Sequence, residues 1–179
     1  MDTIRRLSVM LLTVAGLALL SGCGEGVQPD PQTLANARDD IAQLNAAFTR
    51  AFDAKDASGL ANTFTDDAIF MPPNQAAVKS AVAIQNYARQ TLVAPISGIL
   101  MNANETEVAG DWAYCSGYYS LLGAGNAIID RGKFMEVVKH TDAGWKISRY
   151  IYNSDLPMAP SAYMAPAAGT TAAPAAATH

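Results

Sequence analysis

The sequence predicts an α+β fold in which a curved, cone-shaped antiparallel sheet packs against three N-terminal helices. Two observations predict it. Apolar residues recur at helical spacing before Pro95, and after Pro95 the spacing changes towards two. Helices that precede a block of strands indicate an α+β arrangement rather than an alternating α/β one.

Three helices are expected in the first half of the central segment. Asp56 is suited to cap a short second helix that runs through Leu60 to Phe64, and Ser80 is suited to cap the third, which Pro95 ends. Between them, residues 68–71 form a short strand that Pro72 and Pro73 stop. The first helix is long and amphipathic, with its apolar side formed by Leu34, Ala37, Ile41, Leu44, Phe48 and Phe52.

Four strands are expected after Pro95, over residues 99–108, 112–122, 128–140 and 145–153. Short turns that contain glycine separate most of them. Such turns join neighbouring antiparallel strands, so the four strands are predicted to form a meander.

The N-terminal segment has the features of a signal peptide that ends at Cys23. Residues 1–6 carry two arginines, and the apolar run 7–20 is shorter than the roughly 20 residues that a membrane-spanning helix needs. The stretch Leu20-Ser21-Gly22-Cys23 resembles the lipobox of bacterial lipoproteins. That resemblance implies cleavage before Cys23, lipid attachment to its thiol, and membrane association through the lipid.

The domain limits follow from composition. We predict a signal peptide at 1–22, a lipid-anchored tether at 23–32, one folded domain at 33–157, and a disordered Ala/Pro-rich tail at 158–179. The resemblance to lipoproteins places the protein in the cell envelope. Because Gly24 follows the cysteine, it implies the outer membrane, facing the periplasm, in a Gram-negative host.

The charge pattern excludes two classes of partner. The formal net charge is −4, and no cluster of lysine or arginine is present. A nucleic-acid-binding domain or a domain attracted to an anionic membrane surface would need such a cluster.

Several stretches resemble the SnoaL-like and ketosteroid isomerase-like branch of the nuclear transport factor 2-like superfamily. They are Phe52–Asp56, Phe64–Phe70, Met71–Pro73, Val78–Ile84 with Ser80 where glycine is usual, Gly132–Lys139, Asp142–Ile147 and Tyr152–Asp155. The resemblance implies a pocket at the open end of the cone and a homodimer that pairs sheet faces.

The resemblance argues against isomerase activity. The position of the family's proton-abstracting aspartate is occupied by Pro72, and that of its oxyanion-hole tyrosine by Phe48. Neither side chain can take a proton or donate a hydrogen bond, whereas isomerisation needs both a base and a donor.

The sequence does not predict a metal site, a cofactor site or a reactive cysteine. His140 and His179 have no metal-ligand spacing, and the glycines at 123, 125 and 132 do not form a dinucleotide or phosphate fingerprint, so no metal or cofactor is predicted. Cys115 is expected to be a buried, unreactive thiol.

Glu136 is the one candidate acid or base, because it lies on a strand that is apolar on both sides. Burial would raise its pKa towards the range of general acid–base catalysis. The alternative, which we favour, is a structural ion pair with Arg149 or Arg131 of a neighbouring strand.

The aromatic residues of the strands and helices are expected to line the pocket. The candidate ligand-binding residues are Phe48, Phe70, Tyr87, Tyr114, Tyr118, Glu136, Tyr150 and Asn153.

The leading functional hypothesis is an envelope lipoprotein that binds a small apolar or amphipathic molecule without catalysis. One alternative is an enzyme of isomerase, cyclase or hydrolase type that uses Glu136 with Tyr114 or Tyr118. The other is a protein-interaction scaffold of the cell envelope.

Overall fold

The computed structural model describes residues 30–93 and 95–157. The predicted signal peptide, Cys23, the tether up to residue 29 and the predicted tail lie outside these residues. The elements are, in order, α1 (Pro31–Asp53), α2 (Ala57–Ala61), β1 (Phe64–Met71), β2 (Val78–Lys79), α3 (Ala81–Thr91), β3 (Gly98–Ala109), β4 (Trp112–Leu122), the short 3-10 helix η1 (Ala124–Asn126), β5 (Ile128–Thr141) and β6 (Gly144–Ser154).

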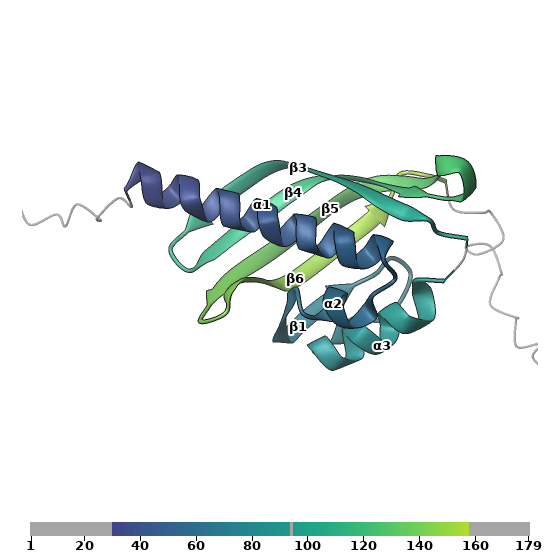
Figure 1. Cartoon of the computed structure of the whole chain (residues 1–179), viewed down its shortest axis with the longest axis horizontal. Coiled ribbons are helices and arrows are strands. Elements are labelled where there is room, and N and C mark those ends of the chain that lie inside the picture. Colours follow the sequence, from purple (N-terminus) through teal and green to yellow (C-terminus); the bar gives the residue numbers. More distant parts are fainter. Residues whose placement is uncertain (1–29, 94, 158–179) are drawn as a thin grey trace, which may run out of the picture.

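Helix α1 is the long amphipathic helix that the sequence predicts (Figure 1). It begins at Pro31, inside the segment assigned to the tether, because the Asp30 side chain accepts a hydrogen bond from the Thr33 backbone N–H. Pro31 in the first turn also favours a helix start at this point, because proline has no backbone N–H that would be left unpaired there. One side of the helix is buried, through Ile41, Leu44, Phe48 and Ala51.

The two predicted caps of the shorter helices are confirmed. The Asp56 side chain accepts from the Gly59 N–H at 2.9 Å, and the Ser80 hydroxyl accepts from the Ala83 N–H at 3.3 Å. The expected end of α2 at Phe64 is wrong, because the helix stops at Ala61 and Phe64 already belongs to β1.

The six strands form one sheet in the order β2-β1-β6-β5-β4-β3. The predicted antiparallel meander of β3 to β6 is confirmed. The structure adds the short strand β2, which pairs with β1, and shows that β1 runs parallel to β6. A parallel neighbour is possible here because α3 and the whole meander connect the two strands, and parallel pairing needs a long connection.

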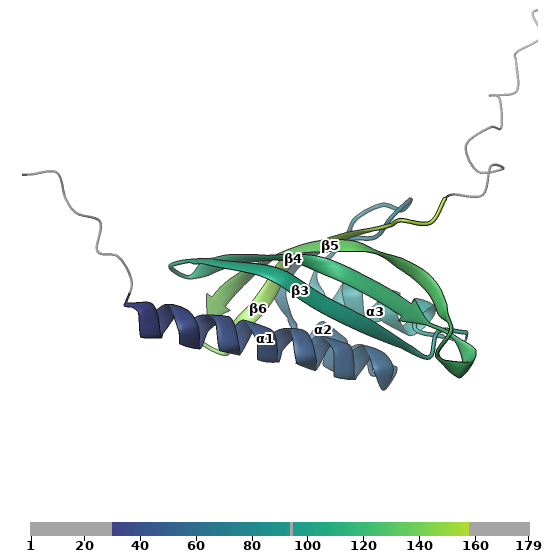
Figure 2. The same ribbon diagram turned by 90° about the horizontal axis from the view of Figure 1, so that it is seen from above.

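The helices all lie on the same side of the curved sheet, and the other face has no helix over it (Figure 2). The core lies between the helices and this inner face, where Cys115, Val138 and Ile147 are fully buried. The outer face carries exposed apolar and aromatic side chains, namely Trp112, Tyr114, Tyr118, Met135 and Ile151. Among the described residues, no helix has the length and apolar character that crossing a membrane would require.

Candidate functional site

A cavity of about 100 Å³ lies between the three helices and the inner face of the sheet. Its wall is almost entirely apolar and contains seven aromatic rings, those of Phe48, Phe52, Phe70, Tyr87, Tyr119, Tyr150 and Tyr152. The aliphatic part of the wall comes mainly from α3 and the start of β3, with Leu60, Ile84, Ala88, Leu92, Ile96, Ile99 and Leu121.

Tyr150 of β6 is the centre of the aromatic wall. Its ring makes stacked contacts with Phe48 of α1, at a centroid distance of 5.6 Å, and with Phe134 of β5, at 5.8 Å. Phe70 of β1 lies 5.6 Å away in a third stacked contact. Offset-stacked aromatic pairs at these distances are favourable beyond the area they bury. The wall is therefore held by contacts among α1, β1, β5 and β6.

The polar groups of the wall come from tyrosines and one threonine. The Tyr119 hydroxyl donates to Asp130 Oδ2 at 2.9 Å, and the Ser154 hydroxyl donates to Asp130 Oδ1 at 2.6 Å. The Thr91 hydroxyl donates to the backbone oxygen of Tyr87 at 2.9 Å. Asp130 therefore positions the Tyr119 hydroxyl at one side of the cavity.

Gly132 lets the Tyr119 ring lie close to the sheet. A Cβ atom at this position would be 2.9 Å from the Tyr119 ring and 1.9 Å from the backbone oxygen of Asn153. Any side chain at position 132 would therefore displace Tyr119, whose ring also makes an edge-to-face contact with Tyr152 at 5.5 Å.

Three of the cavity tyrosines, Tyr119, Tyr150 and Tyr152, have raised pKa values. Burial raises the pKa of Tyr150 well above its usual value. Burial, followed by the hydrogen bond to Asp130, raises the pKa of Tyr119, and burial together with the nearby Tyr87 raises that of Tyr152. These hydroxyl groups can hold a ligand by hydrogen bonds but are poor bases.

Glu136 is buried next to Asn45 of α1. Its side chain is 1% exposed, and neither carboxyl oxygen has a hydrogen-bond partner. Burial raises its pKa to about 7, an effect that the neighbouring Asn45 amide and Cys115 thiol partly offset. Glu136 is not part of the cavity wall.

The expected ion pair of Glu136 with Arg149 or Arg131 is wrong. Strand register places Glu136 opposite Tyr150, whereas Arg149 lies opposite Val137 and so on the other face. The Arg149 guanidinium donates instead to Ser148 and to the Asp67 backbone oxygen. Arg131 alternates with the inward Gly132 and is exposed on the outer face.

Cys115 is the buried thiol that the sequence predicts. It is fully buried opposite Glu136, and its Sγ accepts a weak hydrogen bond from Thr106 at 3.5 Å. Burial, and then the charge of Glu136, raise its pKa to about 12, so the reactive thiolate is absent at neutral pH.

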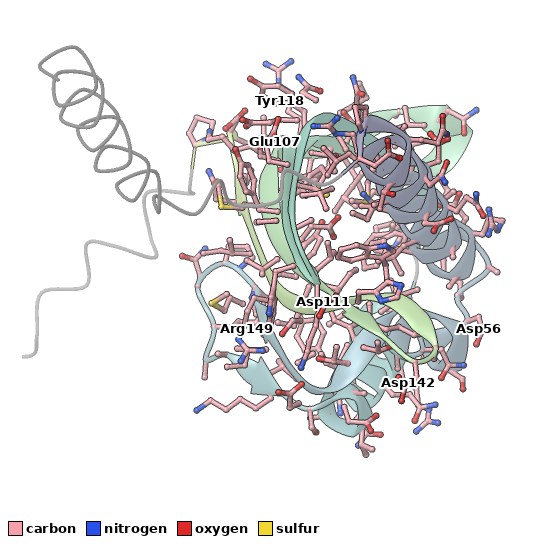
Figure 3. All side chains as sticks on the ribbon, turned by 90° about the vertical axis from the view of Figure 1, so that its left-hand side faces the viewer. Asp56, Glu107, Asp111, Tyr118, Asp142 and Arg149 are labelled. Carbon is pink, nitrogen blue, oxygen red and sulfur yellow. The ribbon has the colours of Figure 1, made fainter. Side chains whose placement is uncertain are left out.

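The structure brings four of the predicted ligand-binding residues together at the cavity: Phe48, Phe70, Tyr87 and Tyr150. Glu136 is buried outside the cavity wall, and the other three strand residues, Tyr114, Tyr118 and Asn153, lie on the outer face. Tyr118 is 57% exposed and lies at the outside of the molecule in Figure 3, and Asn153 is exposed as well. Tyr114 donates a hydrogen bond to Glu105 on that face. The proposed pairing of Glu136 with Tyr114 or Tyr118 is therefore wrong.

Sequence reasoning missed Tyr119 and Tyr152 because it assigned the neighbouring outward positions, Tyr118 and Asn153, to the pocket instead. The signal was present in β4, where the inward positions before Tyr119 are small, namely Ala113, Cys115 and Gly117. Small side chains let the sheet approach α1, so every second residue from Ala113 onward faces inward. Tyr119 is the next residue in this series and therefore faces inward too.

A second hollow, of about 470 Å³, lies on the outer face of the sheet. Tyr118, Lys133, Met135, Ile151 and Asn153 line it. Lys133 is engaged in a salt bridge with Asp155 beside it. This hollow is larger than the inner cavity and somewhat more polar.

In the described part of the chain, no three His, Cys, Asp or Glu side chains gather in a way that could hold a metal ion. Across the same residues, the cavity wall has no carboxylate, imidazole, thiol or amine.

Comparisons with known proteins agree with this architecture. The SnoaL-like domain family matches residues 33–151, and the chain belongs to this family. A comparison with curated proteins finds no match.

Solved structures with the same fold are distant in sequence. A protein of unknown function from Mycobacterium tuberculosis, Rv3472, is 20% identical, with a TM-score of 0.65 over 74% of this chain and 79% of that one. An NTF2-like protein with a cystatin-like fold from Novosphingobium aromaticivorans is 19% identical, with a TM-score of 0.61 over 72% and 87%. A ketosteroid isomerase-like protein from Erwinia carotovora atroseptica is 17% identical, with a TM-score of 0.57 over 72% and 100%. At such identities the likeness establishes the fold and not an activity.

Proposed function

We propose that this chain is a lipid-anchored protein of the cell envelope whose SnoaL-like domain binds a small apolar or amphipathic molecule without catalysis. The observation that carries the proposal is the aromatic cavity between the helices and the sheet. Concave sites with apolar walls and a few placed polar groups are the usual form of small-molecule sites.

The chemistry of the wall favours binding over catalysis. Proton transfer needs a group that gains and loses a proton near the operating pH. The described wall residues offer only tyrosine and threonine hydroxyls, and the pKa values of Tyr119, Tyr150 and Tyr152 are raised. Glu136, the one buried carboxyl with a pKa near 7, lies outside the wall.

Native mass spectrometry of the protein, purified in mild detergent from its own host, tests the proposal. We expect a bound small-molecule mass that identifies the ligand class. Ala88→Leu places a larger side chain into the cavity and should lose that mass, whereas Val82→Leu on the exposed side of α3 should retain it. Protein that is always empty, or ligand retained by Ala88→Leu, would contradict binding in this cavity.

The anchor is tested separately by Cys23→Ser. Without the thiol no lipid can be attached, so we expect the protein to move from the membrane fraction to the soluble fraction of the envelope. Cys115→Ser is the matched control, because it changes the other cysteine and leaves the lipobox intact. Membrane association that persists in Cys23→Ser would refute the anchor.

A further inference from the structure

The hydroxyl hydrogens of two cavity groups are already committed to the protein. Tyr119 donates its hydrogen to Asp130, and Thr91 donates its hydrogen to the backbone oxygen of Tyr87. A hydroxyl group has one donor and two acceptor positions. Both oxygens can therefore accept a hydrogen bond from a ligand but have no hydrogen left to donate.

Asp130 makes this arrangement hard to reverse. Its carboxylate also accepts from the Ser154 hydroxyl and from the Arg131 backbone N–H at 2.8 Å. A carboxylate can only accept, so it holds the Tyr119 hydrogen in place. On this side, the cavity favours a ligand that brings its own O–H or N–H donor.

The walls and the volume restrict the rest of the ligand. Seven aromatic rings line a space of about 100 Å³. An apolar cavity of roughly 150 Å³ is known to hold one benzene molecule, and this cavity is smaller, so it has room for at most one ring. Aromatic walls also favour an aromatic guest through stacked and edge-to-face contacts.

We infer that the ligand is a small monocyclic aromatic alcohol of the phenol class, whose ring lies among the cavity aromatics and whose O–H donates to the Tyr119 hydroxyl oxygen. This inference rests on the proposed function and names the ligand class for the same cavity. An aromatic hydroxyl, unlike an ether or a ketone, supplies the donor that Tyr119 and Thr91 lack.

The test compares phenol with toluene, which has a similar size and no donor. Dissociation constants are measured by protein NMR titration on the full lipidated protein in one detergent, for the native protein, Tyr119→Phe and Tyr118→Phe. The ratio of phenol affinity to toluene affinity is then compared between the three proteins. Because each probe partitions into the same detergent to the same extent in every titration, this partition does not affect the comparison.

We expect Tyr119→Phe to lower the ratio by about fivefold, the effect of losing one hydrogen bond. Toluene affinity should stay unchanged, which also shows that the variant folds with its cavity intact. Tyr118→Phe, on the adjacent position of β4 but on the outer face, should leave the ratio unchanged.

Two results would overturn the inference. An unchanged ratio in Tyr119→Phe would show that Tyr119 does not accept the ligand's hydrogen. A native protein that binds neither probe would exclude monocyclic aromatics as the ligand class. Neither result affects the proposed function, which native mass spectrometry decides on its own.

Discussion

Glu136 shows how one side chain can set the pH dependence of the whole domain. In the unfolded chain its carboxyl ionises near its ordinary pKa of 4.5, whereas burial raises the folded-state pKa to about 7. The folded state therefore binds this proton more tightly. Its contribution to stability is fully present below about pH 4.5 and is lost as the pH rises through 7.

We predict that Glu136→Gln removes the loss of stability that the native protein shows as the pH rises through 7. The pKa shift corresponds to about 3 kcal/mol of unfolding free energy between acid and mildly alkaline pH. Urea unfolding of native protein and variant at about pH 5 and about pH 8 measures it. The native protein should lose stability relative to Glu136→Gln as the pH rises.

Glu107 provides the matched control for this measurement. It is an exposed glutamate paired with Arg38 on the surface, so Glu107→Gln should change stability little and should follow the pH dependence of the native protein. If Glu136→Gln has the same pH dependence as the native protein, Glu136 does not carry a raised pKa.

At the scale of elements, the start of α3 combines a favourable cap with an unfavourable backbone. Ser80 caps the helix through its hydroxyl, yet its φ is 89° and its ψ is 149°. That region of backbone conformation is essentially restricted to glycine. The SnoaL-like resemblance has glycine at this position, and the geometry gives the physical reason.

We predict opposite effects for two substitutions at Ser80. Ser80→Ala loses the cap and keeps the strain, so it should destabilise the protein by about 1 kcal/mol. Ser80→Gly loses little capping energy and relieves the strain, so it should stabilise by about 1 kcal/mol. Thermal unfolding of the two variants and the native protein gives the order of their stabilities. Equal destabilisation by both would show that position 80 is not strained.

The elements also show what a single sequence reveals. The bounds of β4 are those predicted, and the bounds of β3, β5 and β6 differ from the prediction by at most about one residue at each end. These strands were predictable because their apolar patterns are long and most of their turns contain glycine. The first half of β1 was missed because Asp66 and Asp67 interrupt its apolar pattern. The parallel pairing of β1 with β6 was missed because periodicity does not specify a strand's partner.

The site was less predictable than the fold for the same reason. Helix residues such as Phe48 and Tyr87 were assigned to the cavity from their spacing, and they line it. On strands, a period of two leaves two equivalent phases. Tyr114 and Tyr118 were placed inside by choosing the wrong phase of β4, while Tyr119, one residue on, is the tyrosine that faces the cavity.

At the scale of the whole molecule, the bare outer face of the sheet is the surface best suited to a second copy of the chain. Met135 and Ile151 lie opposite each other on β5 and β6, and both are about half exposed. Exposed apolar side chains gathered on one face mark interaction surfaces. The homodimer stays a prediction.

We predict that Met135→Asp combined with Ile151→Asp converts a dimer to a monomer, because the new charges would be buried in the interface. Light scattering coupled to size-exclusion chromatography measures the mass. Val82→Asp is the control, since Val82 is exposed on α3, on the helical side of the molecule. A native protein that is monomeric at all concentrations would refute the homodimer.

The place of β6 in the sheet has a consequence for how the chain folds. It is the last strand of the domain to be synthesised, yet it lies between β1 and β5, and its Ile147 pairs with Phe64 far back in the sequence. Until it arrives, the β1–β2 hairpin and the β3–β5 meander are separate pieces with unpaired edges. Contacts between such distant residues are slow to form, so the final strand sets the pace at which the two pieces become one structure. A chain released before residue 144 would lack β6 and carry two exposed strand edges, the condition that leads to aggregation.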